Sequence, residues 1–464
     1  VGISSPTKKN KAELIDLILK ISSGEMAPPE APRRGRPKKQ TEIPREEEEK
    51  ADAPAKGTAF DKPRENRYVK RDVQKPRETG KAVGFHEERR REEPDQMREG
   101  FLEINPDGYG FLRVKNCECN EMDAYVHAAK IKQYGLRRGD KVRAACKIIQ
   151  DGKPAAVVNV VSINGVDVAE VGKRPNFDDL VPIYPDERLR MEIPSRPRDY
   201  ATRCIDLVAP IGKGQRGIIV SPPKAGKTTL LKMIAGSIAE NYPDIVLFVL
   251  LIDERPEEVT DMQRSVNGEV VYSTFDEMPE HHTKTAEMLL DRAKRLVEMG
   301  KDVVILMDSL TRLARAYNIT ISPTGRSLSG GLDPGALYNP KRFFGAARNI
   351  RGGGSLTIVA TALIDTGSKM DDVIFEEFKG TGNMELHLDR KLSEKRIFPA
   401  IDINKSGTRK EELLLSEKEL NSVFAIRRAM SNLGTGDVTE MIVNKMMKTK
   451  KNEEFILSLI HISE

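Results

Sequence analysis

The sequence predicts an α/β protein in which a small β-barrel is followed by a larger domain built on a parallel sheet. Residues 100–168 hold short runs of alternating apolar and polar residues separated by Gly, Asn and Asp, which is typical of a small barrel. Residues 201–450 alternate continuous apolar strands with helical segments, as expected for parallel strands buried on both faces. At 464 residues the chain has room for two or three domains.

The composition restricts the class of protein further. Charged residues make up 32% of the chain and aromatic residues only 5%, so we expect part of its length not to pack into a core. The net charge of +5 is too small to argue for nucleic acid by itself. No apolar run reaches the roughly 18–20 residues of a membrane span, and we recognise no signal peptide. We therefore expect a cytoplasmic protein with no membrane partner, and free thiols at its cysteines, which are Cys117, Cys119, Cys146 and Cys204.

The first hundred residues divide into two segments. Residues 7–21 place apolar side chains at helical spacing, and we interpret residues 1–30 as the remnant of a helical module. Residues 31–99 are charged and contain few aliphatic residues, so we expect a disordered insertion. Its basic run, Arg33–Lys39, has two interpretations, a phosphate-seeking patch or part of a solvated linker.

The barrel predicted over residues 100–168 has five strands. Five strands in so short a stretch favour an OB-like barrel. We expect the strands at Gly100–Ile104, Gly108–Arg113, Asp123–His127, Asp140–Lys147 and Ala155–Val161.

Aromatic residues of this barrel predict a binding face for single-stranded nucleic acid. Tyr109 and Phe111 alternate around a glycine, so both rings project from one face of the sheet, and Arg113 follows on the same face. Tyr125, on the next strand, extends this surface. Exposed rings of this kind stack on bases. The alternative is that the rings fill the barrel, but the flanking glycines favour exposure.

Residues 169–200 are rich in Pro and charge and are interpreted as an interdomain connector, and residues 451–464 as a C-terminal tail. Between them lies the α/β domain, residues 201–450. Its expected strands are Gly217–Val220, Ile245–Ile252, Val270–Thr274, Val303–Met307 and Leu356–Leu363.

A phosphate-binding loop is predicted at Ser221–Thr228. It joins the first of these strands to a helix expected over Thr229–Ala239, and backbone N–H groups at such a helix start favour a polyphosphate. Lys227 is expected to reach the β- and γ-phosphates, and the Thr228 hydroxyl to hold Mg²⁺. Ser221 stands where the usual pattern has its first glycine.

Two strand ends supply candidate carboxylates. Asp308 ends a buried strand after the phosphate loop, as a Walker-B ligand of Mg²⁺ does; the alternative is a helix N-cap. Glu254 ends another strand at the same sheet edge, and we predict it to be the general base. Asp253 is the second candidate, whereas Glu257 and Glu258 are interpreted as ordinary first-turn helix residues.

An arginine from a second subunit often neutralises the γ-phosphate, and Arg396 and Arg409 are the candidates. Two glycine-containing polar loops, at 322–332 and 365–371, have two interpretations. They are ordinary connectors, or they line the opening of a ring in which Arg326 and Lys369 contact the phosphates of a threaded strand.

Five long motifs of the chain resemble those of the bacterial transcription termination factor Rho family. They are Pro222–Thr228, Leu250–Thr260, Asp308–Asn318, Lys341–Asn349 and Glu376–Leu386, and the resemblance covers roughly residues 100–450. It implies a RecA-like P-loop ATPase domain after an OB-fold barrel of the cold-shock type. It further implies a homohexamer that binds single-stranded nascent RNA, uses ATP and Mg²⁺, and translocates 5′ to 3′. The family unwinds RNA–DNA hybrids and releases transcripts from the RNA polymerase elongation complex, with which elongation factors also associate.

The resemblance also implies roles for individual residues. Glu254 matches the catalytic glutamate, Asp308 the Walker-B aspartate and Arg409 the arginine donated across a subunit interface. Phe398 matches the residue that stacks on adenine, and the other nucleotide-binding positions are Lys224, Ala225, Gly226, Lys227, Thr228, Thr229 and Arg255. The primary RNA site is matched by Tyr109, Phe111, Arg113 and Tyr125, and the secondary, central-channel site by Arg326, Thr366 and Lys369.

The chain departs from the family near Pro154, where an aromatic that helps to form the base pocket is missing, so a preference for cytosine stays open. Two other classes of function also remain. One is a different RecA-type ring motor, such as a DNA helicase or a rotary ATPase subunit. The other is a non-catalytic RNA-binding regulator.

Overall fold

The computed structural model describes residues 96–114, 120–148, 152–430 and 433–460. The helix expected over 7–21, most of the charged insertion and two cysteines, Cys117 and Cys119, lie outside the described residues. Cys146 and Cys204 are buried free thiols. Within the described ranges, no helix is long and apolar enough to cross a membrane.

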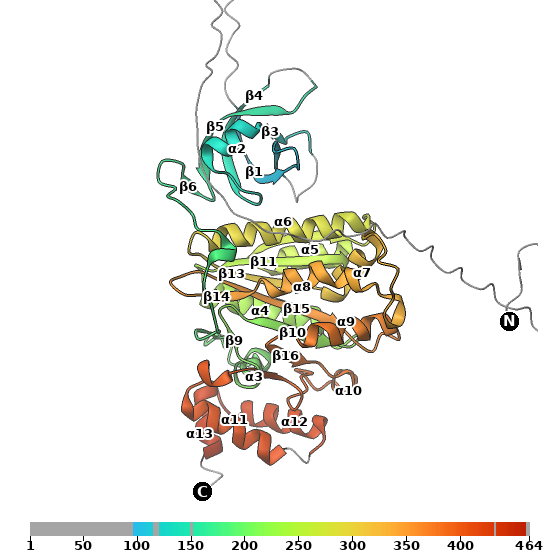
Figure 1. Ribbon diagram of the computed structural model, residues 1–464. Coiled ribbons are helices and arrows are strands. Elements are labelled where there is room, and N and C mark those ends of the chain that lie inside the picture. Colours follow the sequence, from blue (N-terminus) through green and yellow to red (C-terminus); the bar gives the residue numbers. More distant parts are fainter. Residues whose placement is uncertain (1–95, 115–119, 149–151, 431–432, 461–464) are drawn as a thin grey trace, which may run out of the picture. The chain divides into compact units, whose positions relative to one another are not determined.

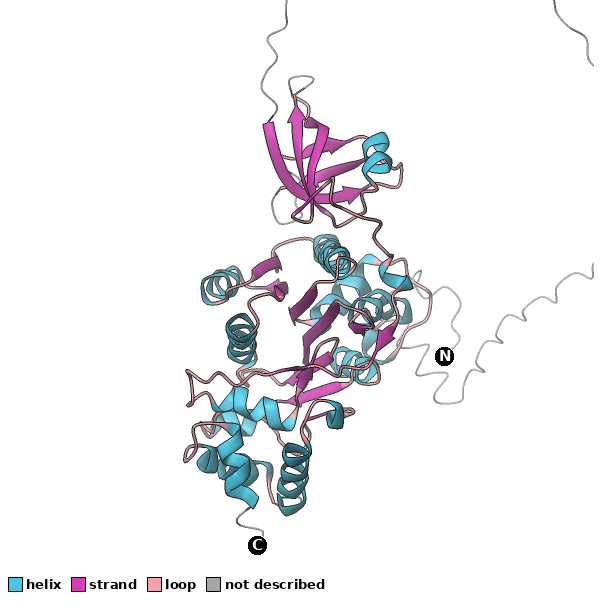
Figure 2. Ribbon diagram, turned by 90° about the vertical axis from the view of Figure 1, so that its left-hand side faces the viewer, coloured by secondary structure: helices cyan, strands magenta, loops and turns pink. Residues whose placement is uncertain are grey.

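The predicted five-stranded barrel is confirmed. Its sheet has the order β3-β2-β1-β4-β5-β6, and a further pairing of β3 with β5 closes it. Figure 2 shows the curled sheet in magenta with its helix in cyan. One helix, α2, stands between β3 and β4 and was not predicted; the His127 side chain caps its start and Gly135 ends it in the left-handed conformation. The elements are β1 (Gln96–Ile104), β2 (Gly110–Arg113), β3 (Ala124–Val126), α2 (Ala128–Tyr134), β4 (Lys141–Lys147), β5 (Ala155–Ile163) and β6 (Val166–Asp167).

Three predicted boundaries need correction. Residues 96–99, which we placed in the disordered insertion, belong to β1 and pair with β4. The segment 169–200, predicted as a connector, is largely exposed but is anchored at several points: Phe177 is 1% exposed, and the short strand β7 (Pro182–Ile183) pairs with β14 (Arg348–Ile350). Buried apolar side chains thus hold this segment in place.

The third correction concerns the predicted tail at 451–464. Residues 452–460 form helix α13 (Asn452–Ile460), in which Phe455 is fully buried. The buried Arg203, on helix α3 (Tyr200–Val208), donates hydrogen bonds to the carbonyls of Met446 and Thr449 and to Asn452 Oδ1. A buried guanidinium needs such partners, so these bonds fix the start of α13.

The larger domain has the predicted parallel sheet, with the order β12-β11-β13-β15-β10-β16-β17 (Figure 1). The strands are β10 (Arg216–Ser221), β11 (Val246–Glu254), β12 (Glu269–Thr274), β13 (Asp302–Asp308), β15 (Ser355–Leu363), β16 (Met384–His387) and β17 (Gly407–Thr408). All five predicted strands are present. The sequence missed β16, because its four residues include a glutamate and a histidine.

Helices cover both faces of this sheet. Alternate residues of one strand enter different cores: Ile219 packs with α4 and α5, whereas Ile218 and Val220 pack with α6 to α9. The helices are α4 (Lys227–Asn241), α5 (Pro256–Ser265), α6 (Pro279–Val297), α7 (Leu310–Thr320), α8 (Tyr338–Gly345) and α9 (Lys369–Lys379). They are followed by α10 (Arg390–Glu394), α11 (Glu417–Met430), α12 (Thr435–Met446) and α13.

Candidate nucleotide and RNA sites

The predicted phosphate loop lies between the carboxyl end of β10 and the start of α4. Lys224 and Gly226 both adopt the left-handed conformation, with φ of 65° and 90°. A Cβ at Gly226 would meet no atom within 4 Å, so the backbone conformation rather than space favours glycine there. The Ser221 hydroxyl, at the unusual first position, donates to the Pro222 carbonyl. A loop of this shape before a helix favours bound phosphate.

The structure brings three of the predicted site residues together. Lys227 Nζ lies 2.5 Å from Asp308 Oδ1 and 3.1 Å from Glu254 Oε1. These carboxylates end β13 and β11, which are neighbours in the sheet, so their carboxyl ends share one edge. Thr361, on β15, donates a hydrogen bond from its hydroxyl to Asp308 Oδ1 over 2.8 Å. Asp308 is not the helix cap considered as its alternative role, because the Ser309 side chain caps α7.

Burial controls the proton affinities of this cluster. Desolvation, followed by the negative charge of Asp308, raises the pKa of Glu254 to about 7, even though Lys227 opposes the shift. Burial works against the charged form of Lys227, but Asp308 and Glu254 together raise the pKa of this lysine above its ordinary value. A carboxylate with a pKa near neutrality suits a general base.

The second candidate base, Asp253, is turned elsewhere. Its backbone is left-handed, with φ of 57°, at an irregularity in the pairing of β11 with β12. Its carboxylate accepts from Arg312 Nη1 over 2.6 Å. The irregular turn therefore separates two adjacent carboxylates, sending Glu254 to the lysine and Asp253 to α7. Arg255 follows as an exposed residue at the start of α5.

The donors suit Mg²⁺ bound together with a nucleotide. Thr228 and Asp308 offer hard oxygen atoms next to the phosphate loop, which is the chemistry Mg²⁺ prefers. Among the described residues, no group of three or more His, Cys, Asp or Glu could hold a metal ion by itself. A site that relies on few protein ligands and on substrate phosphates is usual for Mg²⁺.

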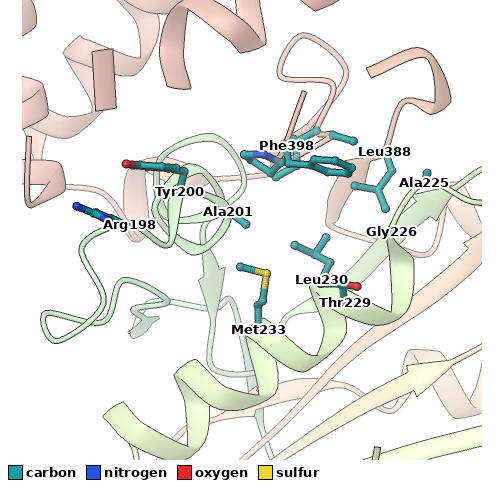
Figure 3. A pocket seen from close by; sticks show the side chains of 13 residues that line it. Arg198, Tyr200, Ala201, Ala225, Gly226, Thr229, Leu230, Met233, Leu388 and Phe398 are labelled. Atoms are coloured by element: carbon teal, nitrogen blue, oxygen red, sulfur yellow. The ribbon is translucent and has the colours of Figure 1, made fainter. Parts of the chain in front are cut away.

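An apolar cavity of about 300 Å³ adjoins the phosphate loop. Figure 3 shows Phe398 on one side of this cavity and Leu230 and Met233 on the other. Phe398 is 49% exposed, so this residue is accessible to a base that enters the cavity. Ala225, Gly226 and Thr229, all predicted to bind nucleotide, also line the cavity. Tyr200 and Met233 also line the cavity. The sequence did not reveal this position of either residue, because neither belongs to a motif.

Arg409 lies away from this cluster. It follows β17, is exposed, and its guanidinium has no hydrogen-bond or ion-pair partner among the described residues. The other candidate, Arg396, lies in an exposed left-handed position after α10. The structure does not bring either arginine to Lys227.

Three aromatic rings form one face of the barrel, as predicted. Tyr109, Phe111 and Tyr125 have ring centroids 5.7–6.0 Å apart. The barrel core is built from other side chains, such as Leu102 and Leu112, so the alternative that these rings fill the core is wrong. All three remain partly exposed and available for stacking.

Arg113 lies beside these rings but is buried. Its guanidinium pairs with Glu103 and Asp123, both at 2.6 Å, and lies 5.1 Å from the centroid of Phe111. Arg113 therefore fixes the position of Phe111 through a cation–π contact. Asp123 is 2% exposed and orients this arginine, a role that the sequence did not reveal.

The two predicted polar loops contact each other. A Cβ at Gly330 would lie 2.5 Å from the Met370 nitrogen, so only glycine permits this approach. Thr366 donates to Asp371 Oδ2 over 2.6 Å, which orders the second loop. Arg326 and Lys369 are exposed on these loops.

The barrel with its aromatic face and the phosphate-loop domain together define an RNA-binding ATPase. The family model "Rho termination factor, RNA-binding domain" matches residues 98–169, and "ATP synthase alpha/beta family, nucleotide-binding domain" matches residues 201–408. Transcription termination factor Rho of Bacillus subtilis is 57% identical over 359 residues, covering 77% of this chain and 83% of that protein. Its counterpart from Thermotoga maritima is 55% identical, covering 77% and 84%. The chain belongs to the transcription termination factor Rho family.

Solved structures add evidence on the fold. An ATPase from a bacterial type III secretion system matches 62% of this chain and 88% of its own, with a TM-score of 0.50 and 22% identity. At this identity the likeness supports the RecA-like fold alone.

Proposed function

We propose that the protein is a homohexameric, RNA-dependent ATPase that terminates transcription. It binds nascent single-stranded RNA, translocates 5′ to 3′, unwinds RNA–DNA hybrids and releases transcripts from the RNA polymerase elongation complex and its associated factors in the cytoplasm. The cluster of Lys227, Glu254 and Asp308 beside the apolar cavity carries this proposal, because a regulator without catalysis would not need it. Membership of the Rho family supports the choice of RNA.

In the proposed mechanism Phe398 stacks on adenine, and the loop from Lys224 to Thr229 holds the phosphates with Arg255 nearby. Glu254, with its pKa raised to about 7, accepts a proton from the attacking water. Bound Mg²⁺, held by Thr228 and Asp308, would supply charge neutralisation at the β- and γ-phosphates. Lys227 leaves its carboxylate partners to contact the phosphates.

Arg409 is proposed to act on the nucleotide of a neighbouring subunit. Its backbone N–H donates to the Asn383 carbonyl, and the adjacent residue Met384 pairs with Gly217 near the amino end of β10. The phosphate loop begins at the opposite end of β10, beyond Ser221. The five steps from Arg216 to Ser221 at about 3.3 Å each separate these ends by roughly 16 Å. Distance thus favours donation to another subunit.

RNA is proposed to bind at two sites. Tyr109, Phe111 and Tyr125 stack on bases at the first site, where the buried Arg113 positions Phe111. Arg326, Thr366 and Lys369 line the second. A partly exposed aromatic face is suited to single strands, whose bases are free to stack on it, rather than to duplex.

ATP hydrolysis measured with poly(C), with other RNAs, with single-stranded DNA and with no polymer tests the proposal. RNA is expected to stimulate turnover strongly, and Glu254→Gln is expected to bind ATP without hydrolysing it. Equal turnover under all four conditions would contradict an RNA motor. Stimulation by DNA alone would favour a DNA helicase.

A further inference from the structure

Asn383 makes several hydrogen bonds at the amino end of β10. Its side-chain Oδ1 accepts from the Arg216 backbone N–H over 2.8 Å and from Gln215 Nε2 over 2.7 Å. Its backbone N–H donates to the Arg216 carbonyl over 3.0 Å, and its own carbonyl accepts from the Arg409 N–H over 2.8 Å. One residue therefore connects the backbone of Arg409 to the strand that carries the phosphate loop.

The position of Asn383 is closely defined. Gln215 is fully buried, and its Oε1 accepts from the Gly212 N–H, so both ends of this amide are engaged. A Cβ at Gly382, the preceding residue, would lie 3.0 Å from Ile218 Cδ1, which brings this backbone close against β10. The side-chain oxygen of Asn383 is thus held between two donors. Gln215 Nε2 also reaches the Asn383 backbone carbonyl over 3.3 Å, so a residue without a side-chain acceptor there would leave the Arg216 N–H unpaired.

The segment that precedes Arg409 is also fixed by hydrogen bonds to other parts of the chain. Arg427, on α11, donates to the carbonyls of Ser406 and Val208. The Thr408 hydroxyl donates to the Pro210 carbonyl over 2.7 Å. In contrast to this fixed backbone, the guanidinium of Arg409 projects without a hydrogen-bond or ion-pair partner within the described ranges. A long side chain on a fixed backbone can reach only a limited volume of space.

We infer that Asn383 is a positioning residue for Arg409. It fixes the arginine to the phosphate-loop strand of its own subunit, so the orientation in which Arg409 reaches a neighbour's nucleotide follows the position of that strand. The inference rests on the proposed action of Arg409 between subunits and deepens it. Asn383 is a positioning rather than a catalytic residue, because it lies at the end of β10 opposite the phosphate loop and acts through Arg409.

The first test compares two variants of Asn383 with a control variant. Asn383→Ala removes the acceptor, and we expect RNA-stimulated kcat to fall about 10- to 100-fold while the affinity for a fluorescent ADP analogue changes less than about twofold, because a 1 Å misplacement of a catalytic group has costs of this order. Asn404→Ala is the matched control, because Asn404 is an exposed asparagine on the segment that leads to Arg409. Asn383→Asp keeps the acceptor and is expected to retain most of the activity. Full activity of Asn383→Ala, or equal loss in the Asp and Ala variants, would overturn the inference.

Mixed hexamers show in which subunit the defect acts. Lys227→Ala subunits do not hydrolyse ATP but still offer Arg409. When they are mixed with Asn383→Ala subunits, intact phosphate loops meet intact arginines, and activity is expected to recover as it does in a mixture with Arg409→Ala subunits.

The two mixtures separate two kinds of failure. If the Arg409→Ala mixture recovers and the Asn383→Ala mixture does not, Asn383 supports its own nucleotide site and the inference is wrong. If the Arg409→Ala mixture itself stays inactive, donation between subunits fails, and the role of Asn383 fails with it.

Discussion

The two ends of β10 carry cations in opposite electrostatic situations. At the carboxyl end, Lys227 is neutralised by Asp308 and Glu254 from neighbouring strands. At the amino end, Arg409 lies on a backbone held by hydrogen bonds, and its guanidinium has no hydrogen-bond or ion-pair partner among the described residues, although the charge of Glu385 acts on it from a greater distance. The first cation already has partners that a nucleotide must displace. The second lacks a partner, which is the state expected of a group that meets phosphate supplied by another subunit.

The largest expected effect comes from removing the unpaired cation. Arg409→Ala should lower RNA-stimulated kcat by about 10³-fold, the magnitude typical of an arginine finger. Nucleotide affinity should change little, because Arg409 lies at the far end of β10 from the phosphate loop of its own subunit. Steady-state hydrolysis and binding of a fluorescent ADP analogue measure the two quantities. Lys405→Ala is the control, because this lysine is exposed on the segment that leads to Arg409.

The contrast between the ends of β10 would break down if Arg409→Ala weakened nucleotide binding as strongly as it slowed turnover. Such a result would show that Arg409 contributes as much to holding the bound nucleotide as to its turnover, and the mixed hexamers would then show which subunit's nucleotide it contacts.

A smaller effect is expected at the barrel, which belongs to neither end of β10. Phe111→Ala should weaken binding of single-stranded RNA by about 1–3 kcal/mol, or roughly 5- to 150-fold, because one stacking surface is lost. Phe111→Tyr keeps the ring and should bind almost normally. Fluorescence anisotropy with a labelled oligonucleotide measures the affinity, and nucleotide binding should be unchanged. Equal affinity of the Ala and Tyr variants would contradict a stacking role.

The pH dependence of hydrolysis tests the role of Glu254, at the carboxyl end of β10. The pKa of Glu254 is raised to about 7, so this side chain is protonated below pH 7 and cannot accept a proton from water. We expect kcat/KM to rise about tenfold per pH unit below 7 and to level off above it. Glu254→Gln should remove the activity, and with it the rise of kcat/KM below pH 7. A profile flat from pH 5.5 to 8 would argue against Glu254 as the base.

The sequence predicted the carboxyl end of β10 far better than the amino end. Glu254 and Asp308 follow long apolar strands, and parallel strands place such residues on one edge. The location of Arg409 depends on β16, whose four residues include Glu385 and His387 and give no clear strand pattern. The tie through Asn383 depends on side-chain geometry that no motif encodes.

Similar reasons explain the other departures from the sequence predictions. The pattern of the barrel placed Arg113 on the correct face, but its pairing with Glu103 and Asp123 depends on the register of three strands. Helix α13 was missed because it is short, and its start is fixed by Arg203, about 250 positions earlier in the chain. Contacts between distant segments cannot be predicted from local periodicity.

The smallest expected effect separates two adjacent carboxylates. Asp253→Asn removes the charge that faces Arg312, whose side chain is 42% exposed. Partly exposed ion pairs contribute at most about 1 kcal/mol, so kcat should fall less than about fivefold, whereas Glu254→Gln should abolish turnover. Single-turnover hydrolysis with saturating RNA measures both variants. If Asp253→Asn were as inactive as Glu254→Gln while Glu254→Asp retained activity, the general base would be Asp253, and the irregular turn of β11 would have to present it to the nucleotide instead.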